Sequence, residues 1–135
     1  MSEACERLIP TPLDWLAPGS WANANFSIWI GHPEDHQAWE WIVRAREVLM
    51  QHKESVDSRQ WNQAYEELLV AEGSDWMWWF GNDFSSESDA IFDGLFRQHI
   101  GNVYRLLGLP PPEGLNNPIK KNLDGRHMVM PPPPL

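Results

Sequence analysis

The sequence predicts an all-α protein with a three-helix bundle-like domain and Pro/Trp-rich extended connectors at both ends. Three runs of the chain place apolar residues at the spacing of one helix face, and residues that start or stop helices flank each run. The prolines lie mostly outside these runs, for example at Pro110–Pro112 and Pro131–Pro134. We therefore expect a connector over 1–31, a three-helix domain over 32–109 and a Pro-rich extension over 110–135.

The first helix is predicted over about 34–53. Pro33 suits a first helical turn, and Glu34 and Asp35 place negative charge near the positive end of the helix. Before it, Asn25–Ile30 alternates polar and apolar residues, which favours a short strand or extended segment. The apolar stripe of the helix consists of Ala38, Ile42, Ala45, Val48 and Leu49.

The second helix is predicted to begin at Asp57 or Ser58, because either side chain can accept hydrogen bonds from the first turn. Gly73 is the expected left-handed residue that ends it. Its predicted buried side consists of Trp61, Ala64, Tyr65, Leu68 and Leu69.

The third helix is predicted over about 87–107. Ser86 and Asp89 have the spacing of a capping box, and Gly108 followed by Pro110 ends the helix. Its predicted apolar face consists of Phe92, Leu95, Phe96, His99, Val103, Leu106 and Leu107.

Composition excludes several classes of partner. The 135 residues suit one domain, and the net charge of −9 would repel phosphate backbones and anionic membranes. The single cysteine, Cys5, has no partner for an internal disulfide. No basic segment leads into an apolar leader, and no 18-residue apolar run is present. We expect a cytoplasmic protein that binds neither nucleic acid nor membrane.

The histidines do not predict a metal site. His32 and His36 are four residues apart, but their order with the residues between them matches neither common zinc pattern and no third ligand is evident. His99 lies on an apolar stripe, where a hydrogen-bonded core histidine is expected rather than a ligand or base. We therefore predict no metal and no cofactor.

The segment from Ala71 to Phe80 is the most informative part of the chain, because it combines two carboxylates with four large aromatic rings. Flat aromatic faces and carboxylate oxygens are suited to the C–H faces and hydroxyls of a sugar. Core packing remains the alternative for any one of the nine tryptophans. Consecutive side chains point in different directions, so we expect some of these rings to face a cleft, a partner or water.

Three carboxylates are candidates for glycoside chemistry: Glu72, Asp75 and Asp83. Hydrolysis usually needs two carboxyl groups that flank the bond. Glu72 and Asp75 share a face only if the helix continues through Gly73. Asp75 either caps a short helix from Trp76 or binds a substrate hydroxyl. The residues favour a carbohydrate-binding surface over a self-sufficient enzyme.

Several motifs, in order, resemble glycoside hydrolase family 57 over about residues 15–119. They are Pro18-Gly19-Ser20-Trp21, Asn25–Asp35 with Ala38-Trp39-Glu40, LLVAEGSDWMWWFGND over Leu68–Asp83, and the helix Phe92–Gly108. The resemblance implies action on α-glucans. Members of that family have an incomplete (β/α) barrel followed by a helical domain that closes one side of the cleft, and this chain resembles the helical part only.

The resemblance also implies roles for individual residues. The family's Glu nucleophile and Asp general acid lie on barrel strands, and no segment here matches either motif, so no catalytic residue is assigned. The Asp-Trp pair of the helical part matches Asp75 and Trp76, which would bind a glucosyl unit and wall its site. Trp21 is a further candidate beside the cleft.

Three hypotheses follow. The chain is a helical segment, either a fragment or a split subunit, that needs a separate catalytic barrel polypeptide to act on α-glucan or maltooligosaccharide. Alternatively, it is a stand-alone glucan-binding or protein-interaction module. The third hypothesis is a nonfunctional remnant whose exposed Trp15, Trp21 and Trp29 favour aggregation.

Overall fold

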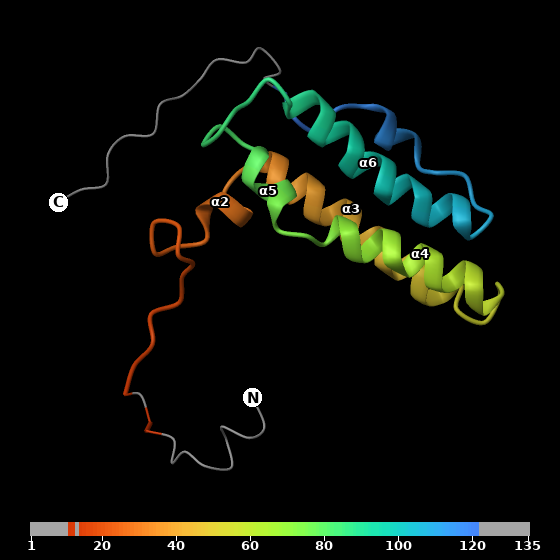
Figure 1. Ribbon diagram of the computed structural model, residues 1–135, viewed down its shortest axis with the longest axis horizontal. Coiled ribbons are helices and arrows are strands. Elements are labelled where there is room, and N and C mark those ends of the chain that lie inside the picture. The colour runs from red at the N-terminus through yellow and green to blue at the C-terminus, as the bar shows by residue number, and fades with distance from the viewer. Residues whose placement is uncertain (1–10, 13, 122–135) are drawn as a thin grey trace.

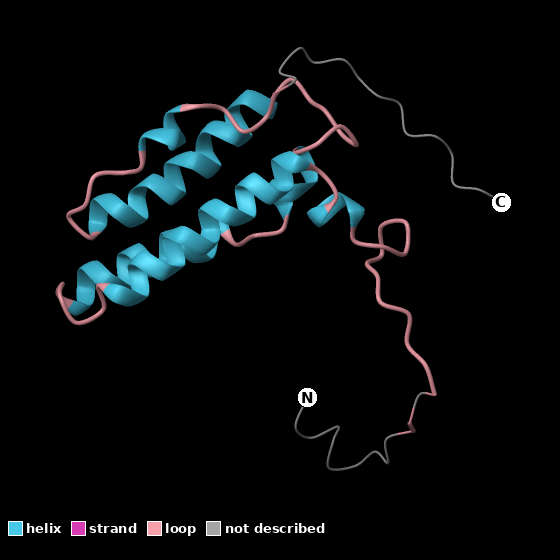
Figure 2. Cartoon of the chain, turned by 180° about the vertical axis from the view of Figure 1, so that it is seen from behind, coloured by secondary structure: helices cyan, strands magenta, loops and turns pink. Residues whose placement is uncertain are grey.

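The computed structural model describes residues 11–12 and 14–121, and these contain helices and no strand (Figure 2). The all-α prediction is therefore confirmed for this part of the chain. The elements are α2 (Ser27–Ile30), α3 (Pro33–Gln51), α4 (Ser58–Ala71), α5 (Asp75–Trp79), α6 (Asp89–Leu106) and the 3-10 helix η1 (Glu113–Asn116).

The three longest helices, α3, α4 and α6, each pack against the other two (Figure 1). The short helices α2 and α5 contact each other and lie at one end of this group. Apolar side chains from all three long helices meet in one core, which includes Ala38, Ile42, Leu49, Ala64, Leu68, Phe96, Ile100 and Val103. The short helices therefore lie against one end of the group formed by α3, α4 and α6.

Helix α3 begins at Pro33, one residue before the predicted start. The Asp35 carboxylate accepts a hydrogen bond from the backbone N–H of His32 at 3.0 Å, which satisfies a donor at the helix entry. The predicted stripe faces the core, and Trp41, which the sequence analysis left out, is buried beside it.

Helix α4 begins as predicted, because the Asp57 carboxylate accepts from the backbone N–H groups of Arg59 and Gln60 at 2.8 and 3.0 Å. The predicted role of Gly73 is wrong: the helix ends at Ala71, and Gly73 is not in the left-handed region. The N–H of Gly73 instead bonds to the carbonyl of Val70 in a tight turn. Leu69, predicted to be buried, is 46% exposed.

Helix α6 begins at Asp89, whose carboxylate accepts from the N–H and the hydroxyl of Ser86. Gly108 has φ +75°, which confirms its predicted role in ending the helix. Leu95 is 41% exposed, contrary to the predicted face, whereas Ile100 and Tyr104 are buried. The buried face is therefore rotated slightly from the one that the sequence indicated.

The predicted extended segment at Asn25–Ile30 is wrong, because Ser27–Ile30 forms helix α2. The Asn25 side chain accepts hydrogen bonds from the N–H and hydroxyl of Ser27 at 2.9 and 2.7 Å. An Asx side chain that bonds two residues ahead starts a turn, which here outweighs the short polar–apolar alternation.

The chain from Pro110 to Lys121 packs on the helices instead of extending from them. It contains η1 and buries Leu115, Ile119 and Lys120. The predictions for Cys5 and Pro131–Pro134 lie outside the described residues.

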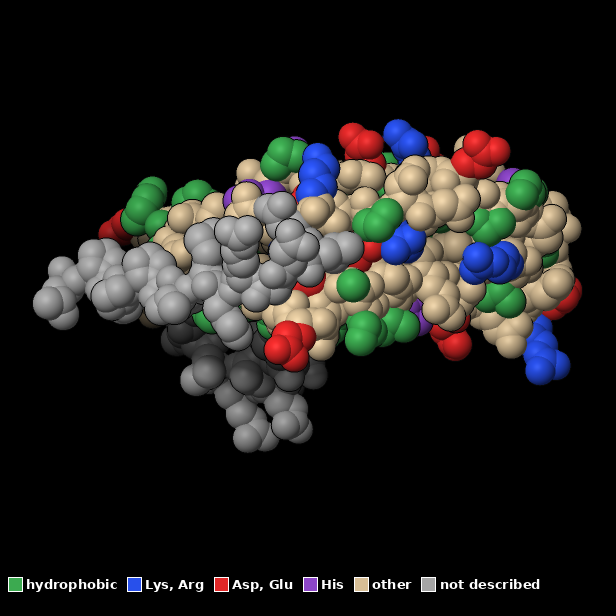
Figure 3. Space-filling view, turned by 90° about the horizontal axis from the view of Figure 1, so that it is seen from above, with side chains coloured by type: hydrophobic (Ala, Val, Ile, Leu, Met, Phe, Trp, Pro, Cys, Tyr) green, Lys and Arg blue, Asp and Glu red, His purple; other side chains and the backbone are tan. Residues whose placement is uncertain are grey.

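Charged side chains of both signs are spread along the face seen in Figure 3, with apolar side chains between them. On the part of this face that is not covered in grey, the Lys and Arg side chains are separated from one another and form no basic stripe. Among the described helices, none combines the length and apolar character needed to cross a membrane.

The Asp57 cap gives a direct test of the local structure. Asp57→Ala removes two hydrogen bonds from the first turn of α4, so we expect a loss of about 1 kcal/mol in the free energy of unfolding. Urea denaturation measures this loss. Ser88→Ala is the control, because Ser88 precedes α6 without a side-chain cap bond. Equal effects of the two substitutions would contradict the assignment.

Candidate aromatic groove

The aromatic run of α5 divides between the core and the surface. Met77 and Phe80 are buried, at 1% and 4% exposure. Trp76, Trp78 and Trp79 are only partly buried. A single turn of helix points successive side chains in different directions, so the run cannot enter one core.

Trp76 is fixed against α6. Its indole N–H donates to the carbonyl of Val70 at 2.7 Å. Its ring lies 6.1 Å from those of Phe92 and Phe96 and 5.9 Å from that of His99, measured between centroids. These contacts make Trp76 a packing residue that joins α5 to α6.

Trp78 is the centre of an aromatic stack. Phe84 lies parallel to it at 4.2 Å, and Trp21 lies parallel at 5.3 Å, between ring centroids. Trp29 from α2 contacts the same ring at 5.7 Å in a tilted arrangement. The stack thus joins Trp21, and Trp29 of α2, to α5, although Trp21 itself is 81% exposed.

Beside this stack lies an open groove of about 420 Å³. It is lined by Trp21, Trp29, Ser74, Asp75, Trp78, Trp79 and Phe92. Its walls are mainly aromatic, and the Asp75 carboxylate and Ser74 supply polar groups at one side. We call this the aromatic groove.

Asp75 is exposed, and none of the described residues forms a hydrogen bond or ion pair with its carboxylate. It is the first residue of α5 and does not cap that helix through its side chain. The other two candidate carboxylates are engaged: Glu72 pairs with Arg46 at 3.0 Å, and Asp83 with His32 at 2.8 Å. Asp75 is therefore the carboxylate whose acceptors remain available to a ligand.

The predicted site residues are thus separated by the structure. Asp75 and Trp21 line the aromatic groove, whereas Trp76 is not among its lining residues. Trp78 and Trp79 line the groove but were not among the predicted site residues. A sequence signal does separate them: Met77 and Phe80 are three residues apart and share the buried side of one helical turn, which leaves Trp78 and Trp79 on another side.

The loop that follows α5 is clamped at Gly81. The N–H of Gly81 donates to Glu34 at 2.7 Å, and its carbonyl accepts from the Lys120 ammonium at 2.6 Å. Lys120 also donates to the carbonyls of Trp79 and Phe84, at 2.8 and 3.2 Å. Trp79 lines the groove and Phe84 stacks on Trp78, so the hydrogen bonds of Lys120 to their carbonyls help to fix the positions of the aromatic rings.

Only glycine fits at Gly81. Its φ is +73°, and a Cβ atom there would overlap the imidazole of His32. The His32 imidazole in turn contacts Asp83. The turn is therefore held from both α3 and the chain around Lys120.

The other two histidines considered as ligands, His36 and His99, are also hydrogen-bonded. The imidazole of His36 bonds to the carbonyl of Ile30 at 2.7 Å. His99 contacts the Glu67 carboxylate at 2.6 Å and is half-buried, so it is hydrogen-bonded as predicted but lies at the edge of the core. Within the described residues, no three His, Cys, Asp or Glu side chains form a possible metal-binding group.

Comparison with known proteins adds no relative: no protein-family model matches the chain, and no curated protein or solved structure is detectably similar to it.

The Gly81 clamp predicts a large effect of Lys120→Met. The substitution keeps the length of the buried side chain but leaves three carbonyls without their charged donor, so we expect a loss of about 3 kcal/mol in the free energy of unfolding. Chemical denaturation measures the loss, and near-UV circular dichroism reports the aromatic stack. Lys121→Met, at an exposed neighbour, is the control. A Lys120→Met protein as stable as this control would contradict the clamp.

The buried carboxyl of Asp35 should make the free energy of unfolding depend on pH. Its carboxyl is fully buried, one oxygen has no hydrogen-bond partner among the described residues, and burial raises its pKa above 3.8. A raised carboxyl pKa stabilises the fold while the group is protonated, and this contribution is lost as the pH rises through the folded-state pKa.

Asp35→Asn removes this titration. The unfolding free energy of the variant should therefore increase relative to wild type as the pH is raised from about 4 towards neutrality. Urea unfolding of both proteins across this range measures the difference. A difference that is constant or decreases with pH would refute the assignment.

Proposed function

We propose that this chain is the helical segment of an α-glucan-active glycoside hydrolase that resembles family 57. In this proposal it has the finer architecture expected from the sequence, a three-helix bundle with connectors. It shapes one wall of the sugar-binding cleft, and a separate catalytic barrel supplies the carboxylates that break the bond.

The aromatic groove is the observation that carries the proposal. Trp21 offers the most ring surface in the groove, at 81% exposure, while Trp78 and Trp79, which stack on Phe84 and Phe92, are partly exposed there. The Asp75 carboxylate lies at the same groove with its acceptors available. A glucosyl unit pairs apolar C–H faces with hydroxyl donors, and this groove supplies a partner for each. Of the three carboxylates considered for catalysis, Glu72 is paired with Arg46 and Asp83 is hydrogen-bonded to His32, which supports a binding role over hydrolysis by this chain alone.

The alternative is a stand-alone glucan-binding or protein-interaction module. The exposure of Trp15, Leu16 and Trp21, between 76% and 81%, favours a surface that a partner covers. A barrel polypeptide and an unrelated protein would both suit such a surface. Mixing the chain with a family 57 barrel separates the two: our proposal predicts amylase activity in the mixture and none from the chain alone.

Asp75→Asn tests the groove directly. The substitution keeps the shape of the side chain but replaces a charged acceptor with a neutral amide, so we expect about tenfold weaker binding of maltotriose to the groove, or about 1.4 kcal/mol. The chemical shifts of the Trp78 and Trp79 indole N–H groups, followed by NMR during titration, measure this affinity.

The control for charge is Asp14→Asn, and the control for an exposed ring is Trp15→Ala, since neither residue lines the groove. Trp21→Ala should weaken binding whereas Trp15→Ala should not. If the Asp75→Asn protein and its control bound the sugar equally well, Asp75 would have no role in binding.

A further inference from the structure

A second groove lies along the outer face of α3, away from its buried stripe. Its volume is about 670 Å³, within the usual range of ligand-binding pockets, roughly 300–1,000 Å³. Its lining residues are Ile30, His36, Trp39, Glu40, Val43, Arg44 and Glu47. Those on α3 recur at intervals of three and four residues, so they share one side of the helix.

The Trp39 ring provides a flat surface in this groove. Its indole N–H donates to the carbonyl of Trp29 at 2.9 Å, so the polar atom of the ring is already satisfied within the protein. The ring is only partly buried, and Val43 and Ile30 beside it are 51% and 52% exposed. What this surface offers a ligand is therefore apolar contact.

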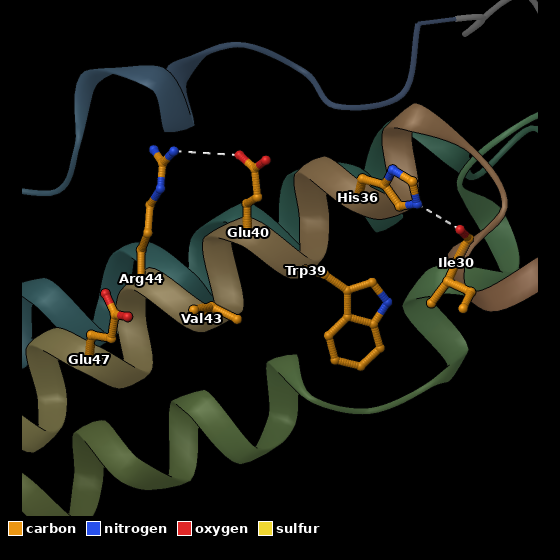
Figure 4. A pocket seen from close by; sticks show the side chains of 7 residues that line it. All are labelled: Ile30, His36, Trp39, Glu40, Val43, Arg44 and Glu47. Carbon is orange, nitrogen blue, oxygen red and sulfur yellow. Dashed lines mark hydrogen bonds and ion pairs between the residues drawn. The ribbon is translucent and has the colours of Figure 1, made fainter.

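Polar groups border the apolar surface. Figure 4 looks onto the face of α3 that lines the groove. The Trp39 ring extends from one edge of this face, Glu40 and Arg44 extend from the opposite edge, and Val43 lies between them. Glu40 and Arg44 form an exposed ion pair at 3.4 Å, which costs little to rearrange. Glu47 adds a further carboxylate at the groove.

This combination suits a sugar better than an apolar peptide. A ring face matches the C–H face of a glucosyl unit, and carboxylate and guanidinium groups match its hydroxyls as acceptors and donors. Burying an apolar peptide segment here would instead remove water from four ionisable side chains, those of His36, Glu40, Arg44 and Glu47.

The second groove adjoins the first through α2. Trp29 lines the aromatic groove, its neighbour Ile30 lines the α3 groove, and the Trp39 hydrogen bond joins α3 to the carbonyl of Trp29. Neighbouring residues of one short helix therefore line both grooves.

We propose that the α3 groove is a second binding surface for α-glucan, with the Trp39 ring as its platform. This inference rests on the proposed function, since it takes its ligand class from the aromatic groove. Two sugar-binding surfaces on one chain favour long glucans, because binding at the first raises the effective concentration of the polymer at the second.

The test is an NMR titration of the full chain with maltotriose, in which each of the nine tryptophans has its own indole N–H signal. In the wild type we expect the Trp39 signal to shift and saturate. The affinity measured at Trp39 should be unchanged in Asp75→Asn, although binding at the aromatic groove is about tenfold weaker, and this difference excludes an effect transmitted from that groove through Trp29. Val43→Glu and Val43→Arg fill the groove with opposite charges, and each should weaken binding at Trp39 at least about tenfold.

Met50→Glu and Met50→Arg are the matched controls, because Met50 is an exposed residue of α3 outside the groove, and both should bind as the wild type does. An unresponsive Trp39 signal would overturn the inference. So would unchanged binding in the Val43 variants, or loss in only one of them, which would indicate a charge effect. A response at Trp39 without one at Trp78 and Trp79 would overturn the proposed function of the aromatic groove and leave a sugar site on α3.

Discussion

The structure of the candidate site depends on two buried charged groups that hold the backbone of a single residue, Gly81. Glu34 accepts from the N–H of Gly81, and Lys120 donates to its carbonyl. One of these residues lies at the start of α3 and the other near the end of the described chain. A buried charge is costly unless it is hydrogen-bonded. Here the Lys120 ammonium donates to three carbonyls, and each Glu34 oxygen accepts from a backbone N–H, that of Gly81 or that of Lys121. The turn after α5 is therefore fixed by residues that are distant in the sequence, and so are Trp79 and Phe84, whose carbonyls the same ammonium holds.

This fixed turn explains how five consecutive residues serve two environments. Met77 and Phe80 complete the core, Trp76 joins α5 to α6, and Trp78 and Trp79 line the aromatic groove. Parallel stacking of Trp78 with Phe84 and with Trp21 links the loop after α5 to the chain before α2. Aromatic stacking adds about 0.5–1.5 kcal/mol per pair beyond burial, enough to position a segment in which Trp15, Leu16 and Trp21 are exposed.

Local patterns in the sequence predicted the helices well and the site only in part. Pro33, Asp57 and Gly108 act on the residues beside them, so their roles could be predicted. The prediction for Gly73 was wrong because a glycine also suits an ordinary turn. The prediction for Asn25–Ile30 was wrong because the hydrogen bond from Ser27 to the Asn25 side chain starts helix α2, whereas the short polar–apolar alternation indicated an extended segment. The clamp at Gly81 was not predictable, because Glu34 and Lys120 are far apart in the sequence. Nothing in the residues around either one indicates that the two meet at the same turn. The same holds for Trp76: the resemblance to family 57 implied that it walls a sugar site, but its contacts with α6 are tertiary and could not be predicted.

The central claim is that the chain provides one wall of a glucan groove at Asp75 and lacks the groups that break the bond. A crystal structure of the chain with a bound maltooligosaccharide tests this claim most directly. The account predicts a glucosyl unit in the aromatic groove, against the exposed parts of the Trp21, Trp78 and Trp79 rings, with a hydroxyl donating to the Asp75 carboxylate and the glycosidic bonds intact. A saturated crystal with an empty aromatic groove, or a saccharide cleaved beside Asp75, would contradict it.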